Sequence, residues 1–230
     1  MVRELGSTKE IQKDFISNVS HEFKTPLSAI EGYATLLQDK TISDSEREEY
    51  TEEIISTTRT MTELVTNILL LSRVENQAID YKKEEYRLDE QIREVVVMLE
   101  PLWSAKNVEF DAELEEIKVT QNHALLINVW RNLIDNAIKF APENSKIAVT
   151  LTNEQNDAVF TVTDEGDGIN ESEKELIFHK FYQSDTSRKQ QGNGLGLPLV
   201  KRILELVGGS ISVQNVEGNG CQFTVKIPNK

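Results

Sequence analysis

Apolar residues recur at helical spacing through the first third of the chain, with no strand-like alternation between them. In a first segment, steps of three and four separate Ile16, Val19, Phe23, Leu27, Ile30, Ala34 and Leu37. A second segment repeats this spacing at Ile54, Thr58, Met61, Val65, Ile68 and Ser72. The periodicity predicts two long amphipathic helices between about residue 10 and residue 75.

The stretch between these segments, DKTISDSERE, is short and polar. Ser43 precedes Glu46 by three residues, which is the spacing of a capping box that opens a helix. Two long helices joined by a short loop form an antiparallel hairpin, and one hairpin alone covers its apolar stripes poorly. We expect two copies to pair into a dimeric four-helix bundle, with packing against the rest of the same chain as the alternative.

The pattern becomes mixed after a polar stretch at residues 76–83. Apolar spacing predicts helices over Leu88–Leu102 and His123–Phe140. Alternation predicts short strands at 108–114 and 117–120, and two hairpins, KIAVTLT with AVFTVTD and SISVQNV with CQFTVKI. This combination is typical of an α/β two-layer sandwich, in which helices cover one face of a mixed, mainly antiparallel sheet.

Composition and charge narrow the class of protein. The chain has 230 residues, enough for two modest domains, and a formal charge of -14. That charge argues against nucleic acid as a partner, because phosphate neutralisation needs clustered Lys and Arg. The sequence has no apolar run long enough to span a bilayer. The single cysteine, Cys221, is typical of a reducing compartment, so we expect a cytoplasmic location without direct membrane contact.

His21 is the first candidate for chemistry. A helix turns by about 100° per residue, which places His21 roughly 160° from the middle of the apolar stripe. Thr25 shares this outer face, and Glu22 lies at its flank. Pro26 would remove a hydrogen bond from the helix interior and bend its axis. The exposed imidazole could serve as a base, a ligand or a nucleophile, or have no role at all.

Metal binding and hydrolase chemistry find little support. The three histidines and the single cysteine show no metal-ligand spacing. The GxSxG elbow of a serine hydrolase does not occur. A nucleophilic histidine would need an electrophile from elsewhere in the protein.

Two glycine clusters favour nucleotide binding. The first, Asp164–Ile169 (DEGDGI), follows a predicted strand; its glycines allow close approach of a ligand, and its acidic side chains can accept a hydrogen bond from an exocyclic amine. The second, Gly192–Leu197 (GNGLGL), leads into a predicted helix whose N-terminal amides can face a phosphate. It is neither a Walker A loop nor a Rossmann fingerprint. Ordinary turns are the alternative for both clusters.

A third polar group lies inside the helix predicted at 123–140. Asn132, Asn136 and Lys139 fall on one face of that helix, which would usually mean a solvated face. Amide oxygens with a lysine, however, suit a hydrated Mg²⁺ and phosphates, because Mg²⁺ takes oxygen ligands and keeps waters. Asp135, beside this face, can be structural instead.

Five motifs in order, SHEFKTPL, NLIDNAIKF, DEGDGI, IFHKFY and GNGLGL, closely resemble the H, N, G1, F and G2 boxes of the sensor histidine kinases of two-component systems. The resemblance extends from about residue 10 to the end of the chain. It implies a dimerisation and histidine-phosphotransfer hairpin at residues 1–76. It also implies a catalytic ATP-binding domain at residues 77–230, with the GHKL sandwich fold shared by gyrase, Hsp90 and MutL.

The same resemblance implies roles for single residues. His21 would accept the γ-phosphoryl group of ATP, Glu22 would orient or deprotonate its imidazole, and Thr25 would position water during dephosphorylation of a partner. Asp164 would accept the adenine amine, and Asn136 would bind Mg²⁺. The other nucleotide-binding positions would be Asn132, Lys139, Phe140, Gly166, Gly168, Ile169, Phe181, Arg188, Gly192, Gly194, Leu195, Gly196 and Leu197.

Three positions depart from the family pattern. Gln183 stands where Arg is frequent after the F box, and Arg188 or Lys189 could supply that charge instead. Lys24 replaces the usual Arg beside the histidine, and Pro198 replaces a usual Ala. Proline is tolerated in the first turn of a helix.

The activity implied is that of an ATP-dependent protein-histidine kinase that requires Mg²⁺. It would act as a homodimer, pass its phosphoryl group to an aspartate of a response regulator receiver domain, and dephosphorylate that regulator. One alternative is a GHKL ATPase clamp or chaperone without phosphotransfer; another is an adaptor that binds no ATP. Family members usually carry a preceding sensor region, which is often transmembrane. We therefore expect this chain to be the cytoplasmic portion of a longer, membrane-bound protein, with a soluble kinase as the alternative.

Overall fold

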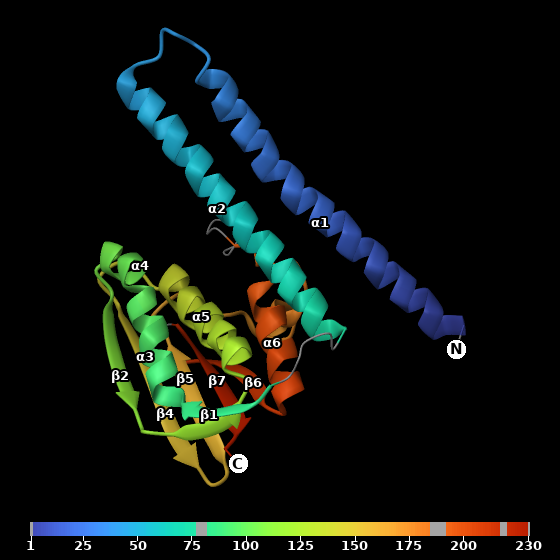
Figure 1. The fold of residues 1–230 in the computed structure, drawn as a ribbon, viewed down its shortest axis with the longest axis vertical. Helices are drawn as coiled ribbons and strands as arrows, with labels where there is room; N and C mark the ends of the chain where they lie inside the picture. The colour runs from blue at the N-terminus through green and yellow to red at the C-terminus, as the bar shows by residue number, and fades with distance from the viewer. Residues whose placement is uncertain (1, 77–81, 185–191, 217–219, 230) are drawn as a thin grey trace. The chain divides into compact units, whose positions relative to one another are not determined.

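The computed structural model describes residues 2–76, 82–184, 192–216 and 220–229, with side chains from residue 16 onward. The chain divides into two compact units, residues 1–69 and 70–230. Figure 1 shows a helical hairpin followed by an α/β sandwich, which confirms the predicted fold classes.

The hairpin consists of helices α1 (Val2–Leu36) and α2 (Asp44–Glu75). The capping box predicted before α2 is present: the backbone N–H and the hydroxyl of Ser43 donate to Glu46 Oε2 over 2.8 and 2.7 Å. In return the Glu46 N–H donates to Ser43 Oγ over 3.2 Å. The rings of Tyr33 and Tyr50, with centroids 5.7 Å apart, join the two helices near the loop.

Helix α1 continues through Pro26, as the sequence predicted. A proline has no N–H, so the carbonyl of Glu22, one turn earlier, lacks its usual helical donor. The interruption therefore falls within one turn of His21.

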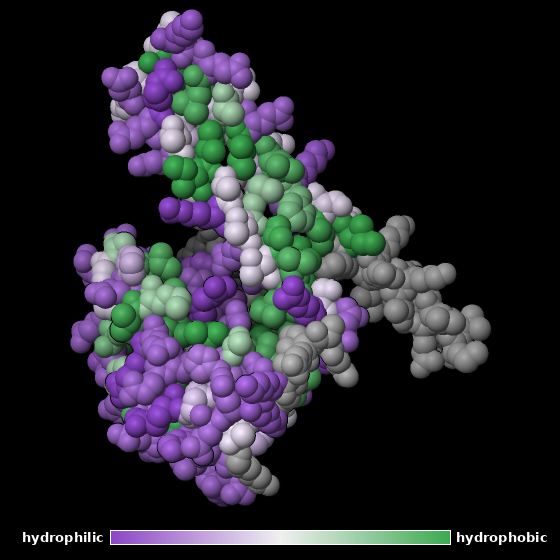
Figure 2. All heavy atoms as spheres, in the orientation of Figure 1, coloured by the Kyte–Doolittle hydropathy of each residue, from purple (hydrophilic) through white to green (hydrophobic). Residues whose placement is uncertain are grey.

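A single hairpin leaves much of its apolar stripe uncovered. Ile16 and Leu27 on α1 keep 59% and 52% of their surface exposed, and Leu69 on α2 keeps 54%. Figure 2 shows green and pale residues gathered along one side of the hairpin, flanked by purple hydrophilic ones. The stripe is therefore available to a second apolar surface.

The sandwich is built on a five-stranded sheet of order β2-β4-β5-β7-β6. Its strands are β2 (Glu109–Leu114), β4 (Lys146–Glu154), β5 (Asp157–Thr163), β6 (Ser210–Asn215) and β7 (Cys221–Pro228). Strands β2 and β4 are parallel, and every other pair is antiparallel. The sheet is therefore mixed and mainly antiparallel, and both predicted hairpins are confirmed.

Helices cover one face of this sheet (Figure 1). They are α3 (Leu88–Met98), α4 (Glu100–Ala105), α5 (His123–Phe140) and α6 (Gly196–Val207). Two single-turn helices, η1 (Glu171–Glu173) and η2 (Leu176–Phe178), precede α6. The core lies between helices and sheet, where the rings of Trp130 and Phe160 pack with centroids 4.7 Å apart.

One prediction about local structure was wrong, and one strand was not predicted. The helix expected over 88–102 is broken at Leu99 into α3 and α4. Pro101 explains the break, because it has no N–H to donate and is tolerated only in the first turn of α4. The polar stretch at residues 76–83 is followed by β1 (Glu84–Arg87), a strand that the sequence did not predict. This strand pairs antiparallel with β3 (Lys118–Gln121) in a separate two-stranded ribbon.

Across the part of the chain that the structure describes, no helix is both long enough and apolar enough to cross a bilayer.

Candidate functional site

The hairpin displays the histidine of the first motif. His21 and Thr25 are exposed, while Glu22 between them is half-buried. The Thr25 hydroxyl donates to the backbone carbonyl of His21 over 3.4 Å, and the spacing of four residues places both side chains on one face of α1. The predicted outward face of the helix thus presents an imidazole to solvent.

Asp164 lies at the end of β5 with only 3% of its surface exposed. Its Oδ1 accepts a hydrogen bond from the Gly166 N–H over 2.9 Å, and its Oδ2 accepts one from the Cys221 thiol over 3.2 Å. Burial raises the pKa of this carboxyl, and the two hydrogen bonds work in the opposite direction. A buried, oriented carboxylate of this kind can recognise a donor such as an amine.

Gly166 joins the loop after β5 to the end of α5. A Cβ on this residue would lie 2.7 Å from the carbonyl oxygen of Phe140 and 2.9 Å from Asp164 Oδ1. Only glycine allows these three groups to pack so closely. Phe140 itself is 38% exposed at the C-terminal end of α5, so its ring is available to a ligand.

The polar face of α5 carries Asn132, Asn136 and Lys139, all half-buried. The Asn132 amide donates to the Asn128 carbonyl over 2.7 Å. The Asn136 side chain has no hydrogen-bond partner among the described residues. The Lys139 ammonium forms an ion pair with Asp135 over 2.6 Å, so the aspartate that we expected to be structural holds this lysine.

The glycine-rich loop reaches the same face of α5. A Cβ on Gly196, the first residue of α6, would lie 2.6 Å from Asn132 Oδ1. The structure therefore brings the second glycine cluster and the Asn132 face together, as nucleotide binding requires. Leu195 is fully buried, so only its backbone can face a ligand, and Leu197 is half-buried.

The F-box segment and Gln183, which follows it, are hydrogen-bonded to the backbone of this loop. The Phe181 N–H donates to the Gly194 carbonyl over 2.9 Å, and the Gln183 side-chain amide donates to the Gly192 carbonyl over 2.8 Å. Phe181 has a φ of 62° and Gly194 a φ of 63°. A left-handed phenylalanine is strained, and such strain clusters at ligand-binding segments.

Sequence reasoning missed several residues at the site. Asn215 and Cys221, on β6 and β7, contact the loop after β5 from positions far along the chain. Gln183, at a position where the family resemblance led us to expect arginine, binds the glycine-rich loop through its side-chain amide. Arg188, and Lys189 beside it, lie outside the described residues.

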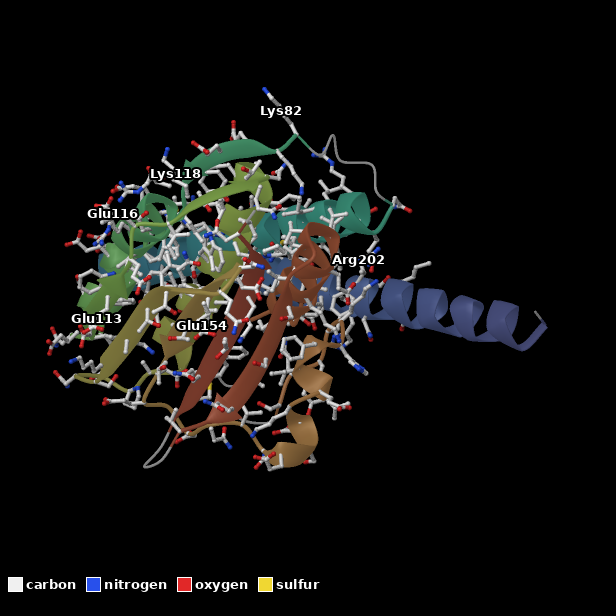
Figure 3. The ribbon with its side chains drawn as sticks, turned by 90° about the horizontal axis from the view of Figure 1, so that it is seen from below. Lys82, Glu113, Glu116, Lys118, Glu154 and Arg202 are labelled. Carbon is white, nitrogen blue, oxygen red and sulfur yellow. The ribbon has the colours of Figure 1, made fainter. Side chains whose placement is uncertain are left out.

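Charged side chains away from the site, such as Glu113, Glu116 and Lys118, project outward in Figure 3.

Two family models match the chain. The His Kinase A (phospho-acceptor) domain matches residues 11–77. The histidine kinase-, DNA gyrase B-, and HSP90-like ATPase matches residues 121–230. The first match includes the exposed His21, and the second includes every nucleotide-site residue named above.

Curated relatives agree with these matches. The heme sensor protein HssS of Staphylococcus saprophyticus is 34% identical over 97% of this chain and 49% of its own length. HssS of Staphylococcus aureus is 31% identical over the whole chain and 50% of its own length. The chain thus spans about half the length of these relatives.

Solved structures extend the likeness to the fold. The catalytic domain of histidine kinase ThkA is 35% identical, with a TM-score of 0.59 over 64% of this chain and 95% of that one. ThkA in complex with the response regulator protein TrrA is 27% identical, with a TM-score of 0.78 over 99% of this chain and 65% of that one. With its histidine-bearing hairpin and its nucleotide-type sandwich, the chain belongs to the sensor histidine kinases, as a phosphoacceptor domain followed by a GHKL-type ATPase domain.

Proposed function

We propose that this chain is the autokinase portion of a two-component sensor, transferring the γ-phosphoryl group of ATP to His21. Residues 1–76 would form the phosphoacceptor domain and residues 77–230 the catalytic domain. The observation that carries the proposal is the presence, in one chain, of an exposed imidazole and of several features that suit a nucleotide site. Those features are the buried Asp164, the α5 amide face and the glycine-rich loop that touches it.

The sandwich supplies recognition of both ends of ATP. Asp164 accepts a hydrogen bond from the adenine amine, because its carboxylate is buried and already oriented by Gly166 and Cys221. The loop ending in Gly196 offers backbone N–H groups at the start of α6, where the helix dipole favours a phosphate. This local arrangement matters because the chain as a whole is strongly acidic.

Mg²⁺ would be held by Asn136 together with the phosphates of the nucleotide. The Asn136 amide oxygen fits this role, because it is an oxygen donor with no hydrogen-bond partner among the described residues. The metal, when bound, neutralises phosphate charge. Asn132 and Lys139 on the same face orient the phosphates. Lys139 contacts them when it breaks its ion pair with Asp135 or shares its ammonium between Asp135 and a phosphate.

The chemical step is an in-line transfer. A ring nitrogen of neutral His21 attacks the γ-phosphorus, a P–N bond forms, the bond to the bridging oxygen breaks, and ADP leaves. Glu22 stabilises or accepts the proton that the imidazole loses. Because the imidazole is solvent-exposed, it is accessible both to ATP and to the protein that later receives the phosphoryl group.

A homodimer supports this step structurally. The uncovered apolar stripe of α1 and α2 is the surface that a second hairpin would bury, forming a four-helix bundle. Removing such large apolar side chains from water contributes about 25 cal/mol per Å², so association would stabilise the hairpin substantially.

The phosphoryl acceptor would be an aspartate in the receiver domain of a response regulator. The similarity to ThkA, solved in complex with the regulator TrrA, supports this partner class. Thr25, on the His21 face, would position a water molecule for dephosphorylation of the same regulator. These activities place the chain where ATP and the regulator are found, in the cytoplasm.

Incubation of the full chain with γ-labelled ATP and Mg²⁺ tests the proposal. We expect acid-labile label on the protein, absent in His21→Ala and retained in Ser20→Ala, which changes an exposed neighbour on the same helix. Release of all label as inorganic phosphate would instead support an ATPase clamp. Absence of any nucleotide binding would support a non-enzymatic adaptor.

A further inference from the structure

We propose that Asn215 and Cys221 are positioning residues that fix the two ends of the nucleotide-base wall, the DEGDGI segment at 164–169. The proposal rests on the proposed function, because it assumes that Asp164 in this wall binds the adenine amine. Neither residue lies in any of the five motifs, and both come from the hairpin of β6 and β7.

The two residues are direct neighbours across this hairpin. Asn215 ends β6, Cys221 begins β7, and they are register partners in the antiparallel pair. Partners of this kind project their side chains to the same face of the sheet. Because β7 also pairs with β5, the side chains of Asn215 and Cys221 lie next to the segment that follows β5.

Cys221 holds the first end of the wall. Its thiol donates to Asp164 Oδ2 over 3.2 Å, and its backbone carbonyl accepts from the Asp164 N–H over 3.1 Å. Burial beside the carboxylate raises the pKa of the thiol, which keeps it a donor at physiological pH. With Gly166 donating to Oδ1, each carboxylate oxygen has its own donor and the plane of the group is fixed.

Asn215 holds the other end of the wall. Its Oδ1 accepts from the Ile169 N–H over 2.9 Å, and its Nδ2 donates to the Ile169 carbonyl over 2.8 Å. One side-chain amide thus binds both backbone groups of one residue. Gly168, which has a φ of 75°, lies close to the same side chain. A Cβ added to Gly168 would stand 3.1 Å from Asn215 Oδ1.

A close backbone approach shows that hairpin and wall pack as one piece. A Cβ on Gly220 would lie 1.9 Å from the carbonyl oxygen of Asp164. Any other residue at Gly220 would push the hairpin off the wall. Losing the bonds of Asn215 or Cys221 would leave the wall to be ordered by the nucleotide itself, at a cost in binding affinity.

Calorimetry on the full chain with ADP and with IDP tests the proposal, because IDP carries a carbonyl in place of the adenine amine. For Cys221→Ala and Asn215→Ala we expect ADP affinity to fall by about fivefold, as for one lost hydrogen bond to an oriented group. IDP affinity should fall less, so the ratio of ADP affinity to IDP affinity should become smaller than in wild type. Cys221→Ser, which keeps a donor, should retain the preference.

Gln214→Ala is the matched control, since Gln214 lies next to Asn215 and its amide binds Gln222 Oε1 over 2.9 Å in the same hairpin. It should leave both affinities unchanged. Equal losses for ADP and IDP, or none, in folded Ala variants would overturn the positioning role. Should Asn215→Ala fail to fold, Asn215→Asp, which keeps the acceptor and loses the donor, decides in its place. A wild-type chain that binds ADP no better than IDP would instead refute the proposed role of Asp164.

Discussion

The hairpin and the α/β sandwich differ in how completely one chain buries their apolar side chains. On the hairpin, Ile16 and Leu27 remain more than half exposed, whereas Trp130 and Phe160 in the sandwich are at most 1% exposed. The sandwich therefore has a complete core of its own, while the hairpin needs another surface. The phosphoacceptor would be carried by an assembling element and the nucleotide by a self-sufficient one.

The functional groups of the two regions differ in the same way. His21 is exposed on its helix, and Asp164 is buried at the end of its strand. The proposed nucleophile would have to be reached by two reaction partners in turn, so exposure suits it. The proposed recognition carboxylate gains from burial, because electrostatic interactions are stronger away from water.

The largest expected effect comes from adding one methyl group in the sandwich. Gly166→Ala would place a Cβ 2.7 Å from the Phe140 carbonyl oxygen and 2.9 Å from Asp164 Oδ1. Overpacking of this kind costs about 2–3 kcal/mol, so ADP affinity should fall on the order of 100-fold. Calorimetric titration of the full chain measures it.

The same change in the hairpin is the control. A Cβ on Gly32 would meet nothing within 4 Å, and replacing glycine by alanine inside a helix stabilises it by about 1 kcal/mol. Gly32→Ala should therefore bind ADP normally and melt slightly higher. Equal ADP affinity in both variants would mean that the wall is not packed as described.

The second prediction concerns the free energy of unfolding of the sandwich. Arg87 donates to both oxygens of the buried Asp89, from Nε over 2.8 Å and from Nη2 over 2.6 Å. Arg87→Ala would leave this buried carboxylate without its counter-charge, with the Ile117 N–H still donating to it, at a cost of about 3 kcal/mol in the free energy of unfolding. Urea unfolding followed by tryptophan fluorescence reports on the sandwich alone, because both tryptophans, Trp103 and Trp130, lie there.

The pH dependence of this loss has a definite sign. The hydrogen bonds from Arg87 lower the pKa of Asp89, so the pair stabilises the fold above the unfolded pKa of about 3.9. That stabilisation disappears as pH falls through the folded pKa, so wild type and Arg87→Ala should converge in acid. A stability difference that grows in acid would contradict this account.

The third effect tests the incomplete core of the hairpin. Leu27→Glu places a charge on the exposed apolar stripe and should weaken dimerisation by at least about tenfold, since burying an unpaired carboxylate is costly. ADP affinity should not change. Leu102→Glu is a matched control, because Leu102 is 49% exposed in the sandwich and Leu27 is 52% exposed.

Light scattering across a concentration series measures the mass of both variants. The comparison between the regions fails if Leu27→Glu remains as dimeric as wild type. It fails equally if Leu102→Glu dissociates the dimer.

The smallest effect is the response of nucleotide binding to mild acid. Burial raises the pKa of Asp164, and its ionised form is the better acceptor for the adenine amine. ADP affinity should therefore begin to fall at a higher pH than an ordinary aspartate would give, by up to about tenfold per unit below the pKa. IDP, which has no amine, should show a flatter profile in the same titration, and identical profiles would count against the role of Asp164.

Local signals explain which elements could be predicted from the sequence. Helix α5 has the predicted ends because Asn122 caps it, with its side chain accepting from Leu125, and Ala141-Pro142 stops it. The strand hairpins follow from alternation within a few residues. Strand β1, EEYR, has no such alternation and depends on a distant partner, β3.

The nucleotide-base wall shows why part of the site could not be predicted. Asn215 meets Ile169 across 46 positions of sequence, and Cys221 meets Asp164 across 57. No local spacing signals these contacts, because they arise only when β6 and β7 pair beside β5. The left-handed backbone of Phe181 likewise depends on the distant Gly194.

Peptide-level mass spectrometry of the chain after incubation with ATP and Mg²⁺, worked up at alkaline pH, tests the central claim most directly. The account predicts one added phosphoryl group on the peptide that contains His21, lost when Asp164→Asn weakens nucleotide binding. A phosphoryl group on another residue, or an unmodified His21 in a chain that binds and consumes ATP, would contradict it.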